Sequence, residues 1–321
     1  MSDRKNILLI DSFAQIFRCY YAVRALSNRN GEPTNAVFGM LRFLLKLEEK
    51  YPGAPGAFVF DKGRPPHRMK LAPDYKANRP PTPEDLLAQL PAIRELIGAF
   101  GWNLVEEQDC EADDLIASIA LQFAPRPVSI VSADKDLSQL VCPRIDMLVP
   151  DMNGKGFARR GIDEVREKFG VPPEAVIDYL ALIGDTADNI PGVPGVGPKT
   201  AAQLLQKFGS VGAMLDRASE IERESLRSKI LAAKERLAVN IELVRLVSEP
   251  PSGAPWPDET IERRPLDIEK IRAVAEQKEL RSMFRDIDAL GASASAAPEQ
   301  PAEEEKPAPA PEPELEQLSL F

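Results

Sequence analysis

Over the first 150 residues, short apolar runs alternate with longer stretches whose apolar residues recur at helical spacing. Short apolar runs fit buried strands, and the stretches between them fit helices that cover a sheet. This alternation predicts βαβ units, and therefore an α/β fold with a mostly parallel sheet flanked by helices. The expected strands are Ile7–Ile10, Ala57–Phe60, Asn103–Val105, Val128–Ser132 and Ile145–Val149, and the expected helices include 34–49, 84–100 and 111–123.

Three of the expected strands are followed closely by an aspartate. Asp11 directly follows the first strand, Asp61 directly follows the second, and Asp134 lies two residues after the strand that ends at Ser132. In open parallel sheets, ligands bind outside the carboxyl ends of the strands. We therefore expect these three carboxylates to meet at one edge of the sheet.

Further acids fall in the first turn of the helix expected over 111–123 and in polar turns. Acids are common in first turns, where the helix dipole favours anions, and also in tight turns, so each group alone has an ordinary structural explanation. That explanation weakens when the acids are taken together. Nine of them lie at strand ends, at a helix start or in turns: Asp11, Asp61, Glu111, Asp113, Asp114, Asp134, Asp136, Asp185 and Asp188.

Such a concentration of carboxylates is unfavourable unless cations occupy the site, because like charges at close range raise one another's pKa. The chain has one histidine and three scattered cysteines, so the available ligands are hard oxygens, which select Mg²⁺ or Mn²⁺. A structural calcium site is the alternative, but no DxDxDG loop supports it. Two such ions can activate a water and stabilise a leaving oxygen, which predicts phosphodiester hydrolysis.

A basic segment, residues 62–79, begins immediately after Asp61. It carries six Lys or Arg side chains against one acid, Asp74, and includes Tyr75. A solvated loop is the simpler reading of a charge run. Positive charge and a stacking ring beside a metal site nevertheless fit a nucleic-acid strand that enters the site, and we favour that function.

The overall charge argues against a nucleic-acid partner until it is divided along the chain. The formal net charge is −10, of which the last 31 residues contribute −6. The nine clustered acids carry more negative charge than residues 1–290 have in total. The other residues of that part of the chain are therefore mildly basic. Nucleic acid therefore stays compatible with the composition.

From about residue 161 to 290, strand signals stop and helical segments with Gly and Pro punctuation follow, which predicts a second, all-helical subdomain. Within it, Gly195, Val196 and Gly197 precede Lys199, Thr200 and an apolar helix. Glycines permit a tight turn, and a helix N-terminus offers N–H groups to a phosphate. The segment resembles the helix-hairpin-helix DNA-binding motif, although a plain helix–helix turn is the alternative. Contacts of this kind would read DNA shape rather than sequence.

The ordered motifs together resemble the 5′ nucleases, meaning the 5′ to 3′ exonuclease domain of bacterial DNA polymerase I and the flap endonucleases. The resemblance covers residues 5 to about 285. It implies a PIN-like nuclease domain over 1–160, with a helical arch at about 62–95, and a helix-hairpin-helix subdomain over 161–290. The matching stretches include ILLIDSFAQIFR, FVFDKGRPPHRMKLAPDYKANRP, EADDLIAS, SADKDLSQLV and YLALIGDTADNIPGVPGVGPKTA.

The resemblance also implies roles for single residues. The first metal site would take Asp11, Asp61, Glu111, Asp113 and Asp114, and the second would take Asp134, Asp136, Asp185 and Asp188. Two catalytic roles are implied: Arg18 would contact the scissile phosphate, and Lys76 would stabilise charge in the transition state. The DNA contacts would come from Arg68, Tyr75 and Arg79 in the arch and from Gly195, Gly197, Lys199 and Thr200 in the hairpin, where family members often bind K⁺.

The last segment, residues 291–321, is rich in Ala, Pro and Glu and has almost nothing to bury, so we expect it to be disordered. Its end resembles the QLxLF peptide that binds the bacterial sliding clamp. A 26-residue linker before that peptide would reach about 28 Å as a flexible coil and could tether the nuclease to a clamp. The residues concerned are Gln317, Leu318, Leu320 and Phe321.

The sequence thus predicts a metal-dependent 5′ nuclease that removes flaps or primers from DNA in replication and repair. A DNA-binding protein with feeble catalysis and a PIN-type ribonuclease are the alternatives. The chain shows neither an export signal nor a long uncharged apolar run, and the scattered cysteines fit a reducing compartment. We therefore expect a cytoplasmic, nucleoid-associated monomer that has no membrane partner.

Overall fold

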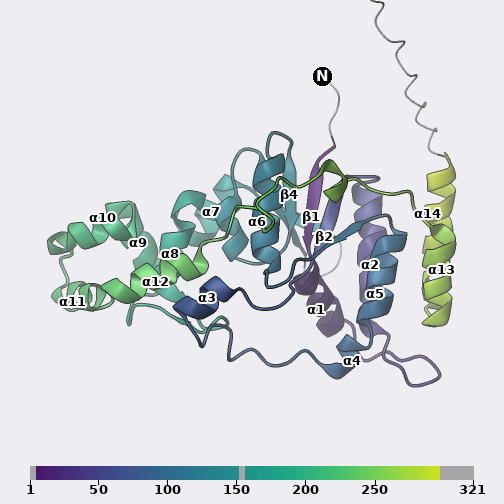
Figure 1. Cartoon of the computed structure of the whole chain (residues 1–321), viewed down its shortest axis with the longest axis horizontal. Coiled ribbons are helices and arrows are strands. Elements are labelled where there is room, and N and C mark those ends of the chain that lie inside the picture. Colours follow the sequence, from purple (N-terminus) through teal and green to yellow (C-terminus); the bar gives the residue numbers. More distant parts are fainter. Residues whose placement is uncertain (1–4, 152–155, 297–321) are drawn as a thin grey trace, which may run out of the picture.

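A computed structural model describes residues 5–151 and 156–296 (Figure 1). Its centre is a six-stranded sheet with the order β3-β2-β1-β4-β5-β6. The first five strands are parallel, and β6 is antiparallel to β5 at the edge. The expected α/β fold with a mostly parallel sheet is confirmed. The strands are β1 (Ile7–Asp11), β2 (Gly56–Val59), β3 (Asn103–Val105), β4 (Val128–Val131), β5 (Ile145–Pro150) and β6 (Phe157–Arg160); the edge strand β6 was not expected from the sequence.

The central strand β1 is buried at all five positions because helices cover both faces of the sheet. Successive side chains of a strand point to opposite faces. Ile7 and Leu9 therefore join one core with α6 (Ala112–Phe123), whereas Leu8 and Ile10 join a second core with α2 (Asn35–Lys50). A strand buried on both faces must be apolar throughout, which explains why the sequence shows continuous apolar runs.

The helix expected over 84–100 is divided into α4 (Glu84–Leu87) and α5 (Leu90–Ala99). Pro91 lies in the first turn of α5, where its missing N–H costs nothing, whereas a continuous helix would place its ring against the carbonyl of residue 87. The break also frees Gln89, whose side-chain oxygen accepts the N–H of Ala36 at 2.8 Å at the start of α2. The helices expected over 34–49 and 111–123 are present as α2 and α6.

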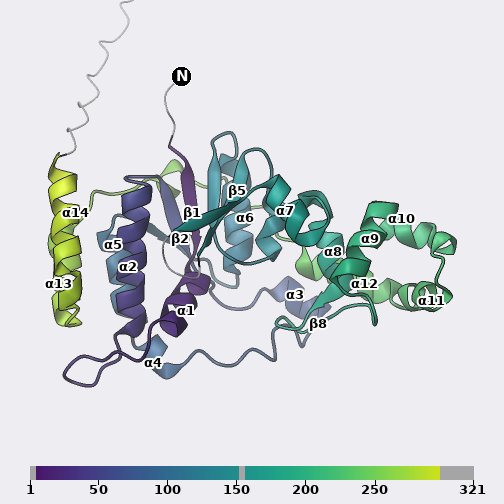
Figure 2. The ribbon, with the colours of Figure 1, turned by 180° about the vertical axis from the view of Figure 1, so that it is seen from behind.

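The basic segment leads from the sheet edge through α3 (Pro66–Leu71) toward the helical part of the chain. That part contains α7 (Ile162–Phe169), α8 (Val176–Ile183), α9 (Pro198–Phe208), α10 (Val211–Asp216), α11 (Glu224–Ala232) and α12 (Lys234–Val244). In Figures 1 and 2, α10 and α11 lie at one end of the elongated molecule, and α3 lies between α12 and the sheet.

The helical part is not all-helical as expected, because a small hairpin of β7 (Gly184–Asp185) and β8 (Ile190–Pro191) separates α8 from α9. Two glycines permit its close backbone approach. Gly184 has φ +73°, and a Cβ there would lie 2.3 Å from the backbone nitrogen of Gly192. The hairpin is short, so strand periodicity could not reveal it.

The last described helices, α13 (Ile268–Gln277) and α14 (Phe284–Ala296), form the opposite end of the molecule from α10 and α11 (Figures 1 and 2). Ile271 and Val274 belong to the core that contains Phe100 and Trp102, so these helices pack on the α/β body rather than on the helical part. α14 also continues through residues 291–296, which we expected to be disordered.

The remaining expected tail, including the clamp-like peptide, lies outside the described residues. Among the described helices, none has the length and apolarity needed to cross a membrane.

Candidate metal centre

Four acids gather where the carboxyl ends of β1, β2 and β4 meet the start of α6. We call them the body acids: Asp11, Asp61, Asp113 and Asp134. Asp11 caps α1 (Ser12–Ala22) by accepting the N–H of Ala14 at 3.2 Å, and it accepts the hydroxyl of Ser132 at 2.9 Å. Burial, followed by the charge of Asp61, raises the pKa of Asp11 to about 7.

Two other body acids, Asp113 and Asp61, also have raised pKa values. Burial raises the pKa of Asp113 well above its usual range, and the charges of Asp134, Asp11 and Asp61 raise it further. The carboxylate of Asp61 accepts the N–H of Ala112 at 3.2 Å. Desolvation by the surrounding protein atoms raises the pKa of Asp61, although part of the residue is exposed to solvent. The sheet therefore brings together carboxylates that repel one another, as the strand ends predicted.

A second group, the distal acids, consists of Asp136, Asp185 and Asp188. Each offers a carboxylate oxygen, and these oxygens all lie within 4.8 Å of one another. Asp136 begins the short 3₁₀ turn η1 (Asp136–Leu140), whereas Asp185 and Asp188 belong to the β7–β8 hairpin. Burial, followed by the charge of Asp134, raises the pKa of Asp136 to about 7.

Asp134 joins the two groups. Its Oδ1 accepts the N–H of Asp136 at 2.9 Å, and its charge raises the pKa of Asp113 on one side and of Asp136 on the other. The resemblance assigned Asp134 to the second metal site alone, whereas the structure places it beside both groups. Seven of the nine expected acids therefore form one continuous site.

The other two expected acids, Glu111 and Asp114, face cations instead. Asp114 accepts Arg68 Nη2 at 2.8 Å and the N–H of Val247 at 2.9 Å, and Arg68 Nη1 donates to both acids. Arg68 was expected to contact DNA phosphate, but in this structure its guanidinium faces acceptors of the protein, so that contact stays a prediction. Its side chain is 2% exposed, and each of its five N–H groups already has an acceptor in the protein.

Tyr75 was expected to stack on a nucleic-acid strand, but its ring is buried in this structure. The residue is 5% exposed and packs in the core, and its hydroxyl lies 3.3 Å from the carboxylate of Glu111. Burial, together with the charge of Glu111, raises the pKa of this hydroxyl. Tyr75 therefore helps to hold the carboxylate of Glu111 from within the core.

Two cations of the basic segment lie at the acids. Lys76 Nζ pairs with Glu111 and lies 3.8 Å from Asp188 Oδ2, and Arg79 pairs with Asp188 Oδ1. Lys76 adopts φ +54°, and its N–H donates to the carbonyl of Asp188 at 3.0 Å, which fixes the backbone beside the distal acids. The acidic neighbours of Lys76 raise its pKa despite its burial. The structure therefore brings Lys76 and Arg79 to the candidate metal centre.

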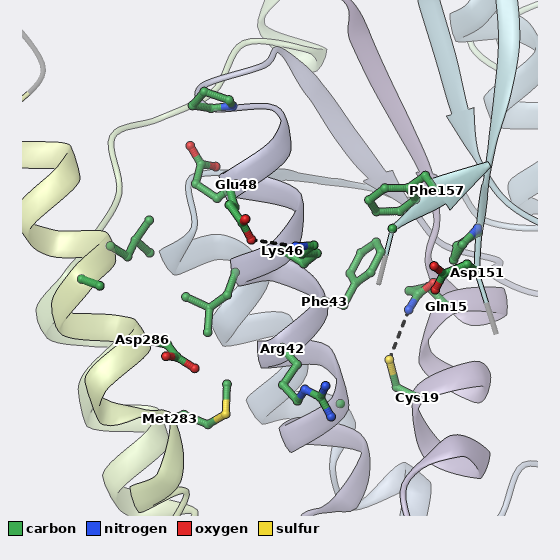
Figure 3. Close-up of a pocket in the computed structure, with 18 of the residues that line it drawn as sticks. Gln15, Cys19, Arg42, Phe43, Lys46, Glu48, Asp151, Phe157, Met283 and Asp286 are labelled. Carbon is green, nitrogen blue, oxygen red and sulfur yellow. Dashed lines mark hydrogen bonds and ion pairs between the residues drawn. The ribbon is translucent and has the colours of Figure 1, made fainter. Parts of the chain in front are cut away.

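Arg18 does not lie with the acids in this structure. Its guanidinium donates to the backbone carbonyl of Asp151 and lines a cavity of about 1170 Å³ between α1, α2 and α14. Figure 3 shows this cavity, with Gln15, Cys19 and Asp151 on one side and Met283 and Asp286 on the other. The expected contact of Arg18 with a scissile phosphate stays a prediction that needs a different side-chain conformation.

The residues of the expected helix-hairpin-helix motif lie together in the exposed turn that leads into α9. Gly195 has φ +85°, a left-handed conformation that glycine adopts readily. Gly197 is the N-cap of α9. Lys199 is exposed in the first turn, next to Thr200. The geometry is that of a tight turn into a helix N-terminus, and the DNA contacts of these four residues stay predictions.

Sequence reasoning missed two residues of the site. Ser132 was read only as part of a strand, yet it binds Asp11 and also accepts the N–H of Asp134 at 3.0 Å. Lys135 pairs with Asp185 across the distal acids. The run Asp134-Lys135-Asp136 was a usable signal, because a lysine between two acids of a metal site is placed to compensate their charge.

A mostly parallel α/β sheet that gathers hard-oxygen ligands at the ends of its strands defines a class of divalent-metal-binding proteins. Residues 6–170 match the family described as 5′-3′ exonuclease, N-terminal resolvase-like domain, and residues 171–269 match 5′-3′ exonuclease, C-terminal SAM fold. The chain belongs to the 5′-3′ exonuclease family.

Similar proteins include a 5′-3′ exonuclease of Aquifex aeolicus, 37% identical over 91% of this chain and 98% of that protein. The thermostable DNA polymerase I of Thermus filiformis is 37% identical over 93% of this chain, which spans 35% of that longer protein. Among solved structures, a bacteriophage T5 flap endonuclease complex with DNA and metal ions has a TM-score of 0.64 at 20% identity, covering 90% of this chain and 100% of that one. This last likeness concerns the fold.

Proposed function

We propose that the protein is a divalent-metal-dependent, structure-specific 5′ to 3′ exonuclease and flap endonuclease that hydrolyses phosphodiester bonds at 5′ flaps and primers in DNA. The observation that carries this proposal is the continuous site of body and distal acids with Lys76 and Arg79 at its rim. Family membership and the likeness to nuclease structures with DNA and metal ions support it.

The acids fit two Mg²⁺ or Mn²⁺ ions. Asp136 Oδ1 is buried and has no hydrogen-bond partner among the described residues, as expected of an oxygen kept for a cation. The raised pKa values of Asp11, Asp113 and Asp136 also support a cation site, because a cation stabilises carboxylates that repel one another. When bound, such ions supply Lewis-acid stabilisation of the phosphoryl group and lower the pKa of water.

The chain's own residues would position the DNA. Lys76 and Arg79 are placed to leave their acidic partners for phosphate oxygens, so a cation is available where negative charge develops. Gly195, Gly197, Lys199 and Thr200 would bind the duplex backbone through N–H groups and charge, without reading sequence. A K⁺ ion at this turn is part of the proposal, as is monomeric action.

We also propose that Gln317, Leu318, Leu320 and Phe321 bind the bacterial sliding clamp. Apolar anchors at the end of an acidic Pro-rich segment support this assignment, since leucine and phenylalanine commonly fill grooves of partner proteins. The gain would come from effective concentration at the DNA. Action in the bacterial cytoplasm, at the nucleoid, follows from that partner.

The deciding experiment is cleavage of a labelled double-flap DNA in Mg²⁺. The wild-type protein is compared with Asp113→Ala and with a chain that ends at Glu316. We expect cleavage at the flap junction, loss of cleavage in Asp113→Ala, and clamp stimulation only when the last five residues are present. Binding without cleavage in both Mg²⁺ and Mn²⁺ would instead identify a structure-specific DNA-binding protein, and preferential cleavage of matched RNA would identify a ribonuclease.

A further inference from the structure

The side chain of Arg68 lies at a junction of three parts of the molecule. It extends from α3 in the basic segment to the start of α6 in the α/β body and to the end of α12 in the helical part. Figure 1 shows α3 beside α12. The acceptors of Arg68 are the carboxylates of Glu111 and Asp114 and the backbone carbonyls of Leu243, at 2.9 Å, and Arg245, at 3.0 Å.

Asp114 is held as completely as Arg68. The residue is 7% exposed, Arg68 donates to both of its carboxylate oxygens, and the N–H of Val247 donates to Oδ1 at 2.9 Å. Consecutive residues of a helix point about 100° apart. In the first turn of α6, Asp113 therefore faces the body acids, whereas Asp114 faces Arg68.

The pair also joins two helix ends of opposite polarity. Arg68 binds carbonyls at the C-terminus of α12, and Asp114 lies in the first turn of α6. A cation at a helix C-terminus and an anion at a helix N-terminus are both favourable. The buried charges thus have partners on every side, which is the condition for a stable buried ion pair.

Glu111 lies between this ion pair and the candidate metal centre. Three donors bind its carboxylate: Arg68, Tyr75 and Lys76. If Lys76 leaves to contact a phosphate, Arg68 and Tyr75 still hold the carboxylate in place. Arg68 is in turn held by Asp114 and by the end of α12.

We propose that Asp114 is not a metal ligand, and that Arg68 and Asp114 form a positioning pair that keeps Glu111 oriented at the metal centre. The pair also fixes the basic segment and the end of α12 against the start of α6. This proposal concerns the site of the proposed nuclease function, and only its kinetic test depends on that function.

The first test compares Asp114→Asn with its neighbour Asp113→Asn, using the full chain. Thermal melting is measured in EDTA, and the number of bound Mn²⁺ ions is measured by electron paramagnetic resonance at a temperature where circular dichroism shows the native fold. We expect Asp114→Asn to melt roughly 10 °C lower, because Arg68 is left buried without its full partner, and to bind as many Mn²⁺ ions as wild type. Asp113→Asn should lose Mn²⁺ without this loss of stability. A lost Mn²⁺ ion in folded Asp114→Asn, or an unchanged melting temperature, overturns the proposal.

A double variant, Arg68→Met with Asp114→Leu, keeps the test open if Asp114→Asn does not fold. Replacing both buried charges by apolar side chains is often tolerated. We expect this variant to fold and to bind Mn²⁺ as wild type does, but to lose about 10²-fold in kcat on flap DNA at unchanged KM, because Glu111 is no longer oriented. Wild-type kcat in the folded double variant overturns the positioning role, and a lost Mn²⁺ ion overturns the assignment of Asp114.

The two proposals fail in different ways. If wild-type protein does not cleave flap DNA with Mg²⁺ or Mn²⁺, the nuclease function is wrong. The Mn²⁺ count and the melting temperatures of Asp113→Asn and Asp114→Asn still decide whether Asp114 is a ligand.

Discussion

The body acids and the distal acids form one site but are supported in different ways. The body acids lie where a buried parallel sheet meets the first turn of a buried helix, so their positions follow from the hydrophobic core. Two of the three distal acids lie on a two-stranded hairpin, which is held by its own turn hydrogen bonds and by bonds from distant segments, including Asn78 to the carbonyl of Thr186 and Asn240 to the carbonyl of Pro191. Carboxylates that must stay close despite repulsion need support, which the hydrophobic core supplies to the body acids and which hydrogen bonds and ion pairs between distant segments supply to the distal acids.

Removing one acid from each group tests whether the body acids and the distal acids contribute unequally to cleavage. We expect Asp113→Ala to lower kcat on flap DNA about 10³-fold, since the loss of a metal ligand removes several kcal/mol of charge stabilisation. Asp185→Ala should cost less, because Asp136 and Asp188 remain and Lys135 is released from its ion pair. Single-turnover cleavage measures both. Equal losses would show that the two halves contribute alike.

Lys76 acts on both groups of acids: its Nζ lies 3.8 Å from the distal Asp188, and its charge lowers the pKa of the body acids Asp61 and Asp113. We expect Lys76→Ala to lower kcat about 10²-fold, as removal of one preorganised donor to developing charge does, with little change in KM. The same substitution should tighten Mn²⁺ binding, because an internal cation no longer competes for the acids. Lys62→Ala is a matched control, since Lys62 lies in the same segment but pairs with Glu106. A Lys76→Ala variant with wild-type kcat would contradict the assignment.

The hairpin can be disturbed without changing any acid. In Gly184→Ala, a Cβ would lie 2.3 Å from the nitrogen of Gly192, and the residue would have to keep φ +73°. We expect Asp185 and Asp188 to move apart and the protein to bind fewer Mn²⁺ ions, while cleavage falls about tenfold because positioning is lost. Gly209→Ala also has a positive φ but no neighbour within 4 Å, so it separates backbone strain from the collision. Unchanged Mn²⁺ binding in Gly184→Ala would mean that the hairpin adapts.

The smallest expected effect is on the pH dependence of stability without metal. Asp11 and Asp136 have pKa values of about 7 in the folded protein, raised above their ordinary value near 3.8. The folded protein therefore retains these protons where the unfolded chain releases them, and stability falls as pH rises from about 4 through about 7. Differential scanning calorimetry in EDTA should show a lower melting temperature at pH 8 than at pH 5.

We expect the matched measurement in Mg²⁺ to reverse this trend, because a bound cation would stabilise the ionised carboxylates. Asp11→Asn should make the slope in EDTA shallower, since it removes one of the acids whose pKa is raised in the folded protein. A metal-free protein that becomes more stable between pH 5 and pH 8 would show that other groups outweigh the repulsion among these acids.

Much of the site could be predicted from local pattern. Continuous apolar runs require strands buried on both faces, and parallel strands bring Asp11, Asp61 and Asp134 to one edge. Asp113 follows because the first turn of α6 points to the same edge. The hairpin β7–β8 escaped prediction because two-residue strands have no periodicity, and the edge strand β6 because it is short and half exposed.

The roles of the charged partners could not be predicted in the same way. The basic segment and the family resemblance predicted DNA contacts for Arg68 and Tyr75, and the acidic first turn and the same resemblance predicted a metal ligand at Asp114. Their partners include Leu243 and Arg245, 175 and 177 residues away from Arg68 in the chain. The exposure of a charged side chain depends on which distant segments cover it, and no local pattern records that.

The sequence by itself determined the α/β fold, the order of the strands' carboxylates along the chain and the family, because hydrophobic periodicity and motif spacing act over a few residues. Only the tertiary structure decided that α13 and α14 cover the α/β body, that Arg18 lines a separate cavity, and that neighbouring aspartates on α6 serve opposite partners. The physical reason is that a buried charge is stable only where other segments supply its counter-charge and hydrogen bonds, and this supply exists only after the chain has folded.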